Sequence, residues 1–187
     1  MANTDAAFGL KAIGKVGQNR DNQGLSEYSI AASATAIYQW DPVEMAATGT
    51  ITVAAATDTL LGSLNGVFYT DASTSKPTWA NHLNASNTAT DIVGFVSDDP
   101  YERFEIQSDA ALTAAEVGMN ADIVYAAGST PNYISKVELD HSDLKTATAQ
   151  LRVIGISKDP QNDEAGAADV NAVVIINEHF LKGTVGI

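Results

Sequence analysis

Residues 60–69 read LLGSLNGVFY and carry the clearest structural signal in the chain. Apolar and aromatic residues recur through this stretch, and only glycine and small polar residues interrupt it, which is typical of strands rather than of helix. Asn65-Gly66 is a dipeptide that favours the tight primed turn of a β-hairpin. The stretch therefore predicts a strand over residues 60–69, and its Asn65-Gly66 pair favours a tight hairpin at that point.

Similar short runs recur along the rest of the chain. Each is rich in β-branched or aromatic residues and is bounded by Gly, Pro, Asn, Asp or Ser, a pattern typical of many short strands. Together they predict an all-β fold, a jelly-roll-like sandwich or barrel of about eight to nine short strands. The other expected strands are residues 27–32, 36–40, 50–54, 92–97, 104–107, 122–125, 151–157 and 170–176.

Helix is expected to be scarce. Thr113-Ala114-Ala115-Glu116 has the spacing of a capping box, but Gly118 and Asn120 end that helix after about one turn. The second candidate is residues 141–149, where Asp143 would cap the first turn. Neither segment is long enough to form a layer of helices.

The chain length and the net charge limit the classes of protein to which this sequence can belong. A chain of 187 residues is typical of one domain, or one domain with an arm. Its formal net charge of -13 predicts repulsion from nucleic acid and from anionic membranes, so we expect neither as a partner. The absence of cysteine excludes disulfides and thiolate chemistry. The sequence also lacks a signal-peptide core and a membrane-length apolar run, which predicts a soluble chain.

Residues 1–24 differ from the rest and predict an extended N-terminal arm on a single β domain at residues 25–187. Four glycines interrupt any apolar period, so the apolar side chains of the arm have no evident local core. Its basic residues would add attraction to an acidic partner surface. The residues predicted to contact a partner or another subunit are Phe8, Leu10, Lys11, Ile13, Lys15, Val16 and Arg20.

No catalytic, cofactor-binding or metal-binding constellation emerges from the sequence. The three histidines lie in unlike settings, and neither a Gly-x-Ser-x-Gly elbow nor a His-Glu-x-x-His motif is present. The acidic segments at residues 98–99, 140–143 and 159–164 lack the spacing of a calcium loop, and ordinary turn chemistry accounts for them. We therefore expect a protein that is not an enzyme and that needs no metal or cofactor.

A series of short motifs follows a fixed order over nearly the whole chain. It begins with Met1-Ala2-Asn3-x-Asp5-Ala6-Ala7-Phe8-Gly9 and ends with Ile176-Asn177-Glu178-His179. The motifs between them are Glu27-Tyr28-Ser29-Ile30-Ala31, Asp41-Pro42-Val43, Leu61-Gly62 with Asn65-Gly66-Val67-x-Tyr69-Thr70-Asp71, Ala89-Thr90-Asp91-Ile92-Val93, Asp98-Asp99-Pro100, Phe104-x-x-Gln107-x-Asp109, Gly118-x-Asn120-Ala121-Asp122-Ile123-Val124-Tyr125 and Leu151-Arg152-x-x-Gly155. In this order they resemble the head decoration, or capsid cement, proteins of tailed bacteriophages. One departure is Trp40, which stands where the family pattern has a glycine before Asp41-Pro42.

The resemblance implies a virion structural protein on the outer surface of the phage head. Such a protein would bridge neighbouring major capsid subunits as a homotrimer and stabilise the shell against internal DNA pressure, and the seven arm residues named above would be its contacts. An acidic body suits that location because packaged DNA repels it. Cementing requires no reaction, since a ligand that binds only the assembled lattice stabilises it by mass action.

Two other classes of function stay open. A secreted or surface β-sandwich could bind glycans through the aromatic side chains of Trp79 and Tyr101. An enzyme would require His179, Glu178 and an aspartate to converge, although a strand-end histidine bonded to its neighbours is the commoner arrangement.

Overall fold

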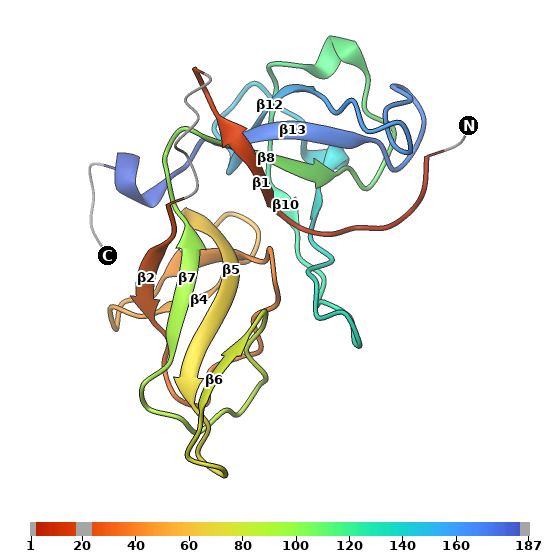
Figure 1. Ribbon diagram of the computed structural model, residues 1–187. Coiled ribbons are helices and arrows are strands. Elements are labelled where there is room, and N and C mark those ends of the chain that lie inside the picture. The colour runs from red at the N-terminus through yellow and green to blue at the C-terminus, as the bar shows by residue number, and fades with distance from the viewer. Residues whose placement is uncertain (1–2, 18–23, 184–187) are drawn as a thin grey trace.

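The computed structural model describes residues 3–17 and 24–183 (Figure 1). Within them the chain forms thirteen strands and three single turns of 3-10 helix: η1 (Ala114–Glu116), η2 (His141–Asp143) and η3 (Phe180–Lys182). No helix in this part of the chain is long and apolar enough to cross a membrane. The predicted all-β, sandwich-like fold with little helix is confirmed.

A five-stranded antiparallel sheet contains both early and late parts of the chain. Its order is β1 (Lys11–Lys15), β8 (Glu102–Gln107), β13 (Asn171–Ile176), β12 (Leu151–Ile156) and β9 (Asn120–Ala121). Side chains alternate along its strands, and every second one enters a core that also receives residues of the small sheet β10 (Ile123–Val124) and β11 (Glu138–Leu139). That core includes Leu10, Phe104, Ile106, Leu139, Leu151, Val153, Val174 and Ile176.

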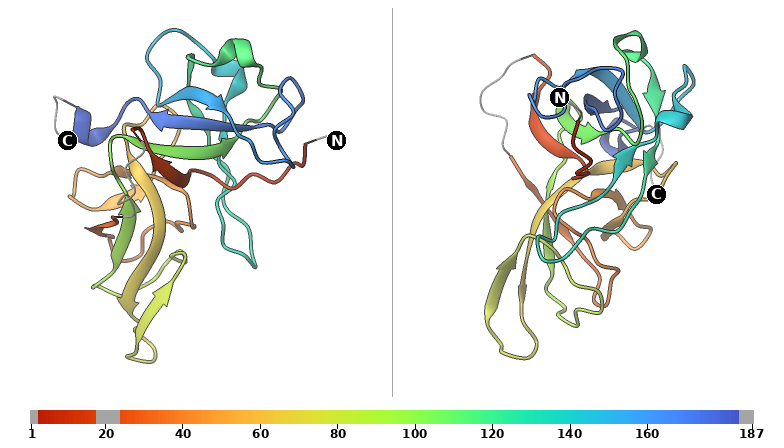
Figure 2. Two further views of the ribbon diagram at one scale, coloured as in Figure 1. Left: turned by 45° about the horizontal axis from the view of Figure 1, so that its top comes forward. Right: turned by 90° about the vertical axis from the view of Figure 1, so that its right-hand side faces the viewer.

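The six-stranded sheet is built from one continuous part of the chain, residues 26–97. Its order is β2 (Ser26–Ser29), β7 (Val93–Ser97), β5 (Leu60–Thr70), β3 (Pro42–Met45) and β4 (Ile51–Val53), and β6 (Pro77–Ala80) pairs with the second half of β5. Its own core includes Ile37, Val43, Ile51, Leu61, Leu64, Val67, Leu83 and Val96. Both views in Figure 2 show the five-stranded sheet lying over one end of the six-stranded sheet.

Strand β5 confirms the strand expected over residues 60–69 and corrects the hairpin expected at Asn65-Gly66. It continues from Leu60 to Thr70 without a turn, and its register against β7 shifts between Leu64 and Gly66, so Asn65 lies in a β-bulge. The Trp79 ring covers Gly66 so closely that a Cβ atom there would lie 2.7 Å from Trp79 Cζ2. The glycine therefore serves close packing, and pairing with strands on both sides outweighs the turn preference of Asn-Gly.

Two helix predictions have different outcomes. The Glu116 carboxylate accepts hydrogen bonds from the backbone N–H and the hydroxyl of Thr113, at 2.6 and 2.8 Å, so the predicted capping interaction is confirmed on a single turn. The segment 141–149 forms only the single turn η2.

Residues 36–40 were expected to be a strand and instead make isolated bridges at Ile37 and Gln39.

The sheets divide the chain differently from the predicted arm and body. Strand β1, within the expected arm, pairs with β8 in antiparallel register, with Lys15 opposite Glu102. Residues before β1 are also bonded to the body: Gln107 accepts from the Ala6 N–H and donates to the Thr4 carbonyl, both at 2.9 Å. Residues 3–17 are thus extended, but they are part of the folded body. Local sequence could not show this because Gln107 and strand β8 lie far from this segment in the sequence.

Candidate functional site

The N-terminal strand lies at an edge of the five-stranded sheet, where one part is buried and another is displayed. Leu10 is fully buried in the core, so the expectation of an arm without a local core does not hold for it. Ile13 lies at a register shift between Ala12 and Gly14 and is exposed, and Val16, just after the strand, is 53% exposed. The segment therefore combines an internal anchor with an exposed end.

Residues 8–10 fit tightly between the two sheets. The Leu10 N–H donates to the Trp40 carbonyl at 2.9 Å, and the Phe8 ring meets the Trp40 ring edge to face, with centroids 6.4 Å apart. Gly9 has φ +79°, and a Cβ atom there would lie 2.4 Å from the Trp40 carbonyl oxygen and 2.5 Å from Ser135 Cβ. Glycine is therefore required at position 9 for both conformation and space.

The predicted basic contacts have partners within the chain. Lys15 Nζ lies 2.5 Å from Asp99 Oδ2, and this hydrogen bond raises the pKa of Lys15 and lowers that of Asp99. Lys11 Nζ lies 3.9 Å from Glu105 Oε2 and about 6 Å from the rings of Phe8 and Trp40. Attraction of these lysines to an acidic partner is therefore weaker than the sequence suggests. Arg20 lies outside the described residues.

An exposed surface lies at the end of β1, and we call Val16, Tyr101, Leu181 and Lys182 the β1-end surface. The Val16 N–H donates to the Tyr101 carbonyl at 2.9 Å, and Lys182 Nζ lies 4.6 Å from the centre of the Tyr101 ring. Tyr101 is 62% exposed and Leu181 is 50% exposed. Sequence reasoning assigned no contact to residues 181 and 182, because only the fold brings them to the arm.

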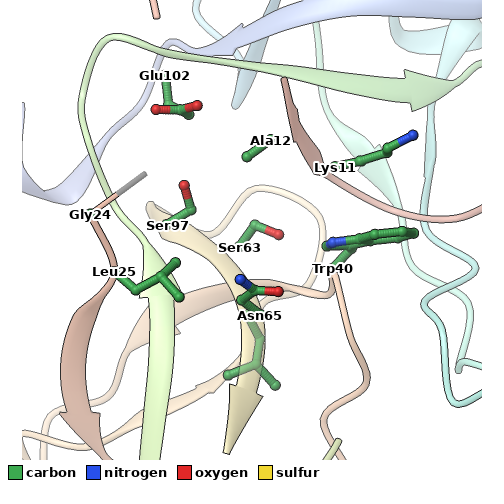
Figure 3. Close-up of a pocket in the computed structure, with 10 residues that line it drawn as sticks. Lys11, Ala12, Gly24, Leu25, Trp40, Ser63, Asn65, Ser97 and Glu102 are labelled. Atoms are coloured by element: carbon green, nitrogen blue, oxygen red, sulfur yellow. The ribbon is translucent and has the colours of Figure 1, made fainter. Parts of the chain in front are cut away.

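A cavity of about 210 Å³ lies at the junction of the two sheets (Figure 3). Figure 3 shows Glu102 on one side of it and Ser63, Ser97 and Asn65 on the other, with Trp40 along the wall. Glu102 is 3% exposed, and burial raises the pKa of its carboxyl to about 7. The other lining residues are Lys11, Ala12, Gly24, Leu25 and Leu64.

Asp41 is a second buried carboxyl group at this junction. Its Oδ2 accepts the Tyr38 N–H at 2.7 Å, and this bond and the Ser135 hydroxyl lower the pKa of Asp41. Burial raises the pKa of Asp41 to about 6. The residue before it, Trp40, has φ 66°, a conformation that glycine adopts more readily.

The three histidines lie in separate environments. His179 is buried at the end of β13, where its Nδ1 accepts the Leu181 N–H at 3.1 Å, and burial lowers its pKa to about 4. His141 pairs with Glu116 at 3.1 Å, and His82 stacks on Tyr133 with ring centroids 3.7 Å apart. Within the described residues, no group of three or more His, Asp or Glu side chains is placed to hold a metal ion.

The two aromatic residues considered for glycan binding lie at opposite ends of β7. Trp79 is cross-strand from Phe68, which in turn pairs with Val93 at the start of β7, and its ring lies 4.8 Å from that of Phe95. Tyr101 follows the other end of β7 and belongs to the β1-end surface. The exposed neighbour of Trp79 is therefore Phe68, not Tyr101.

Comparison of the chain with protein-family models, with curated proteins and with solved structures found no match in any of the three.

Proposed function

We propose that this chain is a virion structural protein that binds the outer surface of a tailed-phage head and bridges neighbouring major capsid subunits as a homotrimer. The ordered motifs between residues 1 and 179 support the family, and the β1-end surface is the observation that carries the proposal. Val16 and Tyr101 place apolar area in solvent beside a strand that is anchored in the core, and Lys182 lies against the Tyr101 ring. Exposed apolar side chains that gather in one place are typical of protein interfaces.

The anchoring of the N-terminal segment suits a bridging role. The Ser63 hydroxyl donates to the Leu10 carbonyl, Gln107 holds residues 4 and 6, and Leu10 itself lies in the core. A contact surface tied to the body in this way transmits a load to both sheets. A loosely tethered tail would lose part of each binding energy to the ordering of its chain.

The charge distribution also bears on the partner surface. Because Lys11 and Lys15 are paired internally, the proposed contact depends on apolar area and on Tyr101 rather than on a basic arm. Aromatic side chains dominate binding energy at interfaces more often than exposed lysines do. Each site can be weak, since many copies on one head multiply the stabilisation of the lattice.

The conformation of Trp40 adds support from the family pattern. The family has a glycine before Asp-Pro, and Trp40 occupies that position with φ 66°. A left-handed residue at this place is what a glycine in the family pattern implies. The agreement connects the resemblance to a backbone feature rather than to residue identity alone.

Binding to purified heads of the phage that encodes this chain tests the proposal. We expect the wild-type protein to bind intact heads, and the double variant V16D/Y101A to bind at least tenfold more weakly while keeping its melting temperature. The matched control is Val117→Asp, an exposed apolar residue next to η1 and away from the β1-end surface. Absence of the chain from purified heads, or equal binding by the double variant, would contradict the proposal.

A glycan-binding role is the second candidate, and the exposed Trp79–Phe68 pair is the observation that favours it. Aromatic faces in this setting can stack on sugar rings. A glycan array with the wild-type protein and the variant W79A distinguishes the two functions. A saccharide signal that is lost in W79A would favour the second candidate.

A further inference from the structure

The cavity at the sheet junction has a chemical character that the proposed capsid contact does not use. Its lining comes from four strands, β1, β5, β7 and β8, together with residues 24–25 and Trp40. At about 210 Å³ it is smaller than a typical site for a drug-sized ligand and has room for a single side chain. Four strands of two different sheets fix its walls, so the site is largely preformed.

Glu102 supplies a charge at one side of the cavity. Its side chain is almost completely buried and, in Figure 3, its carboxylate faces the space enclosed by the other labelled residues. The backbone of Gly14 lowers the pKa of this carboxyl and so favours its charged form. A buried carboxylate is costly unless further donors satisfy its remaining acceptor sites.

Among the described residues, no basic side chain forms an ion pair with the Glu102 carboxylate. Lys15 and Arg103 lower its pKa through their charges, and Asp99 raises it. Lys15, however, is paired with Asp99 at 2.5 Å. Lys11 lines the cavity, but its ammonium group points away from Glu102 in Figure 3 and lies near Glu105.

The remaining lining suits a cation that is carried on an apolar stem. Ser63, Ser97 and Asn65 add neutral oxygen acceptors opposite Glu102, and Leu25, Ala12 and Leu64 add apolar wall. The Trp40 side chain forms another part of the wall, and in Figure 3 the nitrogen end of its ring is turned toward Ser63 and Asn65. A guanidinium group has several donors in one plane, and its hydrocarbon stem packs on apolar walls. A metal ion would require more charged oxygen ligands than one carboxylate.

We propose that this cavity binds the arginine side chain of a partner protein, with the guanidinium group on the Glu102 carboxylate and its hydrocarbon stem against the apolar wall. The inference does not depend on the virion role, because the site is defined by its own geometry. The proposed ligand is thus a guanidinium group, and its site is distinct from the β1-end surface.

Titration with small probes tests this assignment on the full chain. The variant W79F leaves Trp40 as the only tryptophan, so its fluorescence reports the cavity. We expect N-acetyl-arginine methylamide to produce a saturable change with a millimolar dissociation constant. The neutral isostere N-acetyl-citrulline methylamide should bind at least tenfold more weakly. Affinity for the arginine probe should rise between pH 6 and pH 8, because Glu102 must be ionised.

Two variants test whether the Glu102 carboxylate binds the arginine probe. Glu102→Gln should reduce affinity for the arginine probe at least tenfold and remove the pH dependence. Glu138→Gln should change neither, although burial also raises the pKa of Glu138, because Glu138 does not line the cavity. Equal binding of the citrulline probe, or undiminished binding by Glu102→Gln, would overturn the assignment.

A last variant tests whether the cavity is filled by an arginine of this chain rather than by an arginine of a partner. Arg20 lies outside the described residues and is the competing occupant. If Arg20→Gln binds the arginine probe as the parent protein does, the partner assignment is supported. A tenfold or greater gain in affinity would show that Arg20 fills the cavity and would overturn it.

Discussion

The hydroxyl group of Ser63 donates a hydrogen bond of 2.5 Å to the carbonyl oxygen of Leu10. The two residues lie 53 positions apart, one on β5 of the six-stranded sheet and the other just before β1 of the five-stranded sheet. The bond is buried, so it joins the N-terminal segment to both sheets in a region shielded from water. The stability of the junction should therefore depend on residues that the sequence alone assigns to an arm.

Truncation of Leu10 should destabilise the whole molecule. Leu10→Ala removes a fully buried side chain from the core, and such changes typically cost about 2–5 kcal/mol. Ile13→Ala, on the exposed part of the same segment, should change the free energy of unfolding by less than about 0.5 kcal/mol. Urea denaturation measures both. Equal effects of the two substitutions would contradict the packing described for Leu10.

Gly9→Ala should be more destabilising than Gly17→Ala. Both glycines have positive φ, which costs an alanine about 1 kcal/mol, but only at Gly9 would the added Cβ meet the backbone and another side chain. We expect Gly9→Ala to cost at least about 2 kcal/mol and Gly17→Ala to cost only the conformational penalty. Thermal unfolding of the two variants gives the comparison, and similar melting temperatures would refute the close contact at Gly9.

Asp41 should make the protein more stable as the pH falls from 7 to 5. Its pKa is about 6 in the folded state, above the ordinary value of 3.8, so the folded state binds a proton more tightly than the unfolded state. The resulting gain between these two pH values is about 1 kcal/mol. Asp41→Asn should lack this gain, and chemical denaturation of both proteins at the two pH values measures the difference. If the free energies of unfolding of the wild type and of Asp41→Asn changed equally with pH, the burial of an ionisable Asp41 would be contradicted.

His179 should make the protein less stable as the pH falls from 7 to 5. Burial holds its pKa at about 4, below the ordinary value of 6.5, so the histidine contributes its full stability above pH 6.5 and loses it as the pH falls toward 4. Between pH 7 and 5 the loss is about 2 kcal/mol. His179→Gln keeps an acceptor for the Leu181 N–H and should be less sensitive to acid than the wild type, by the same measurement. Unchanged acid sensitivity would show that His179 is free to protonate in the folded state.

Sequence reasoning located the central strands because their signal is local. The expected strands at residues 92–97, 151–157 and 170–176 agree with β7, β12 and β13 to within one residue at each end. It missed β3 and β6, both of which begin with a proline. Proline is nevertheless compatible with the first residue of a strand.

The candidate site was less accessible to prediction than the fold. Leu10 and Ile13 look alike in the sequence, and only pairing with residues 102–105 makes one internal and the other external. Tyr101 and Lys182 likewise come together only through the fold. Local sequence lacks this information because each of these contacts spans about 80 residues or more.

The pairing of Lys15 with Glu102 joins two strands that are far apart in the sequence. Strands β1 and β8 are antiparallel neighbours, as in a hairpin, but the connection between them contains the entire six-stranded sheet. A loop whose ends lie side by side can accept a large insertion without disturbing the strands that flank it. The six-stranded unit therefore has the topology of an insertion between β1 and β8, and changes in its length should leave the pairing of these two strands intact.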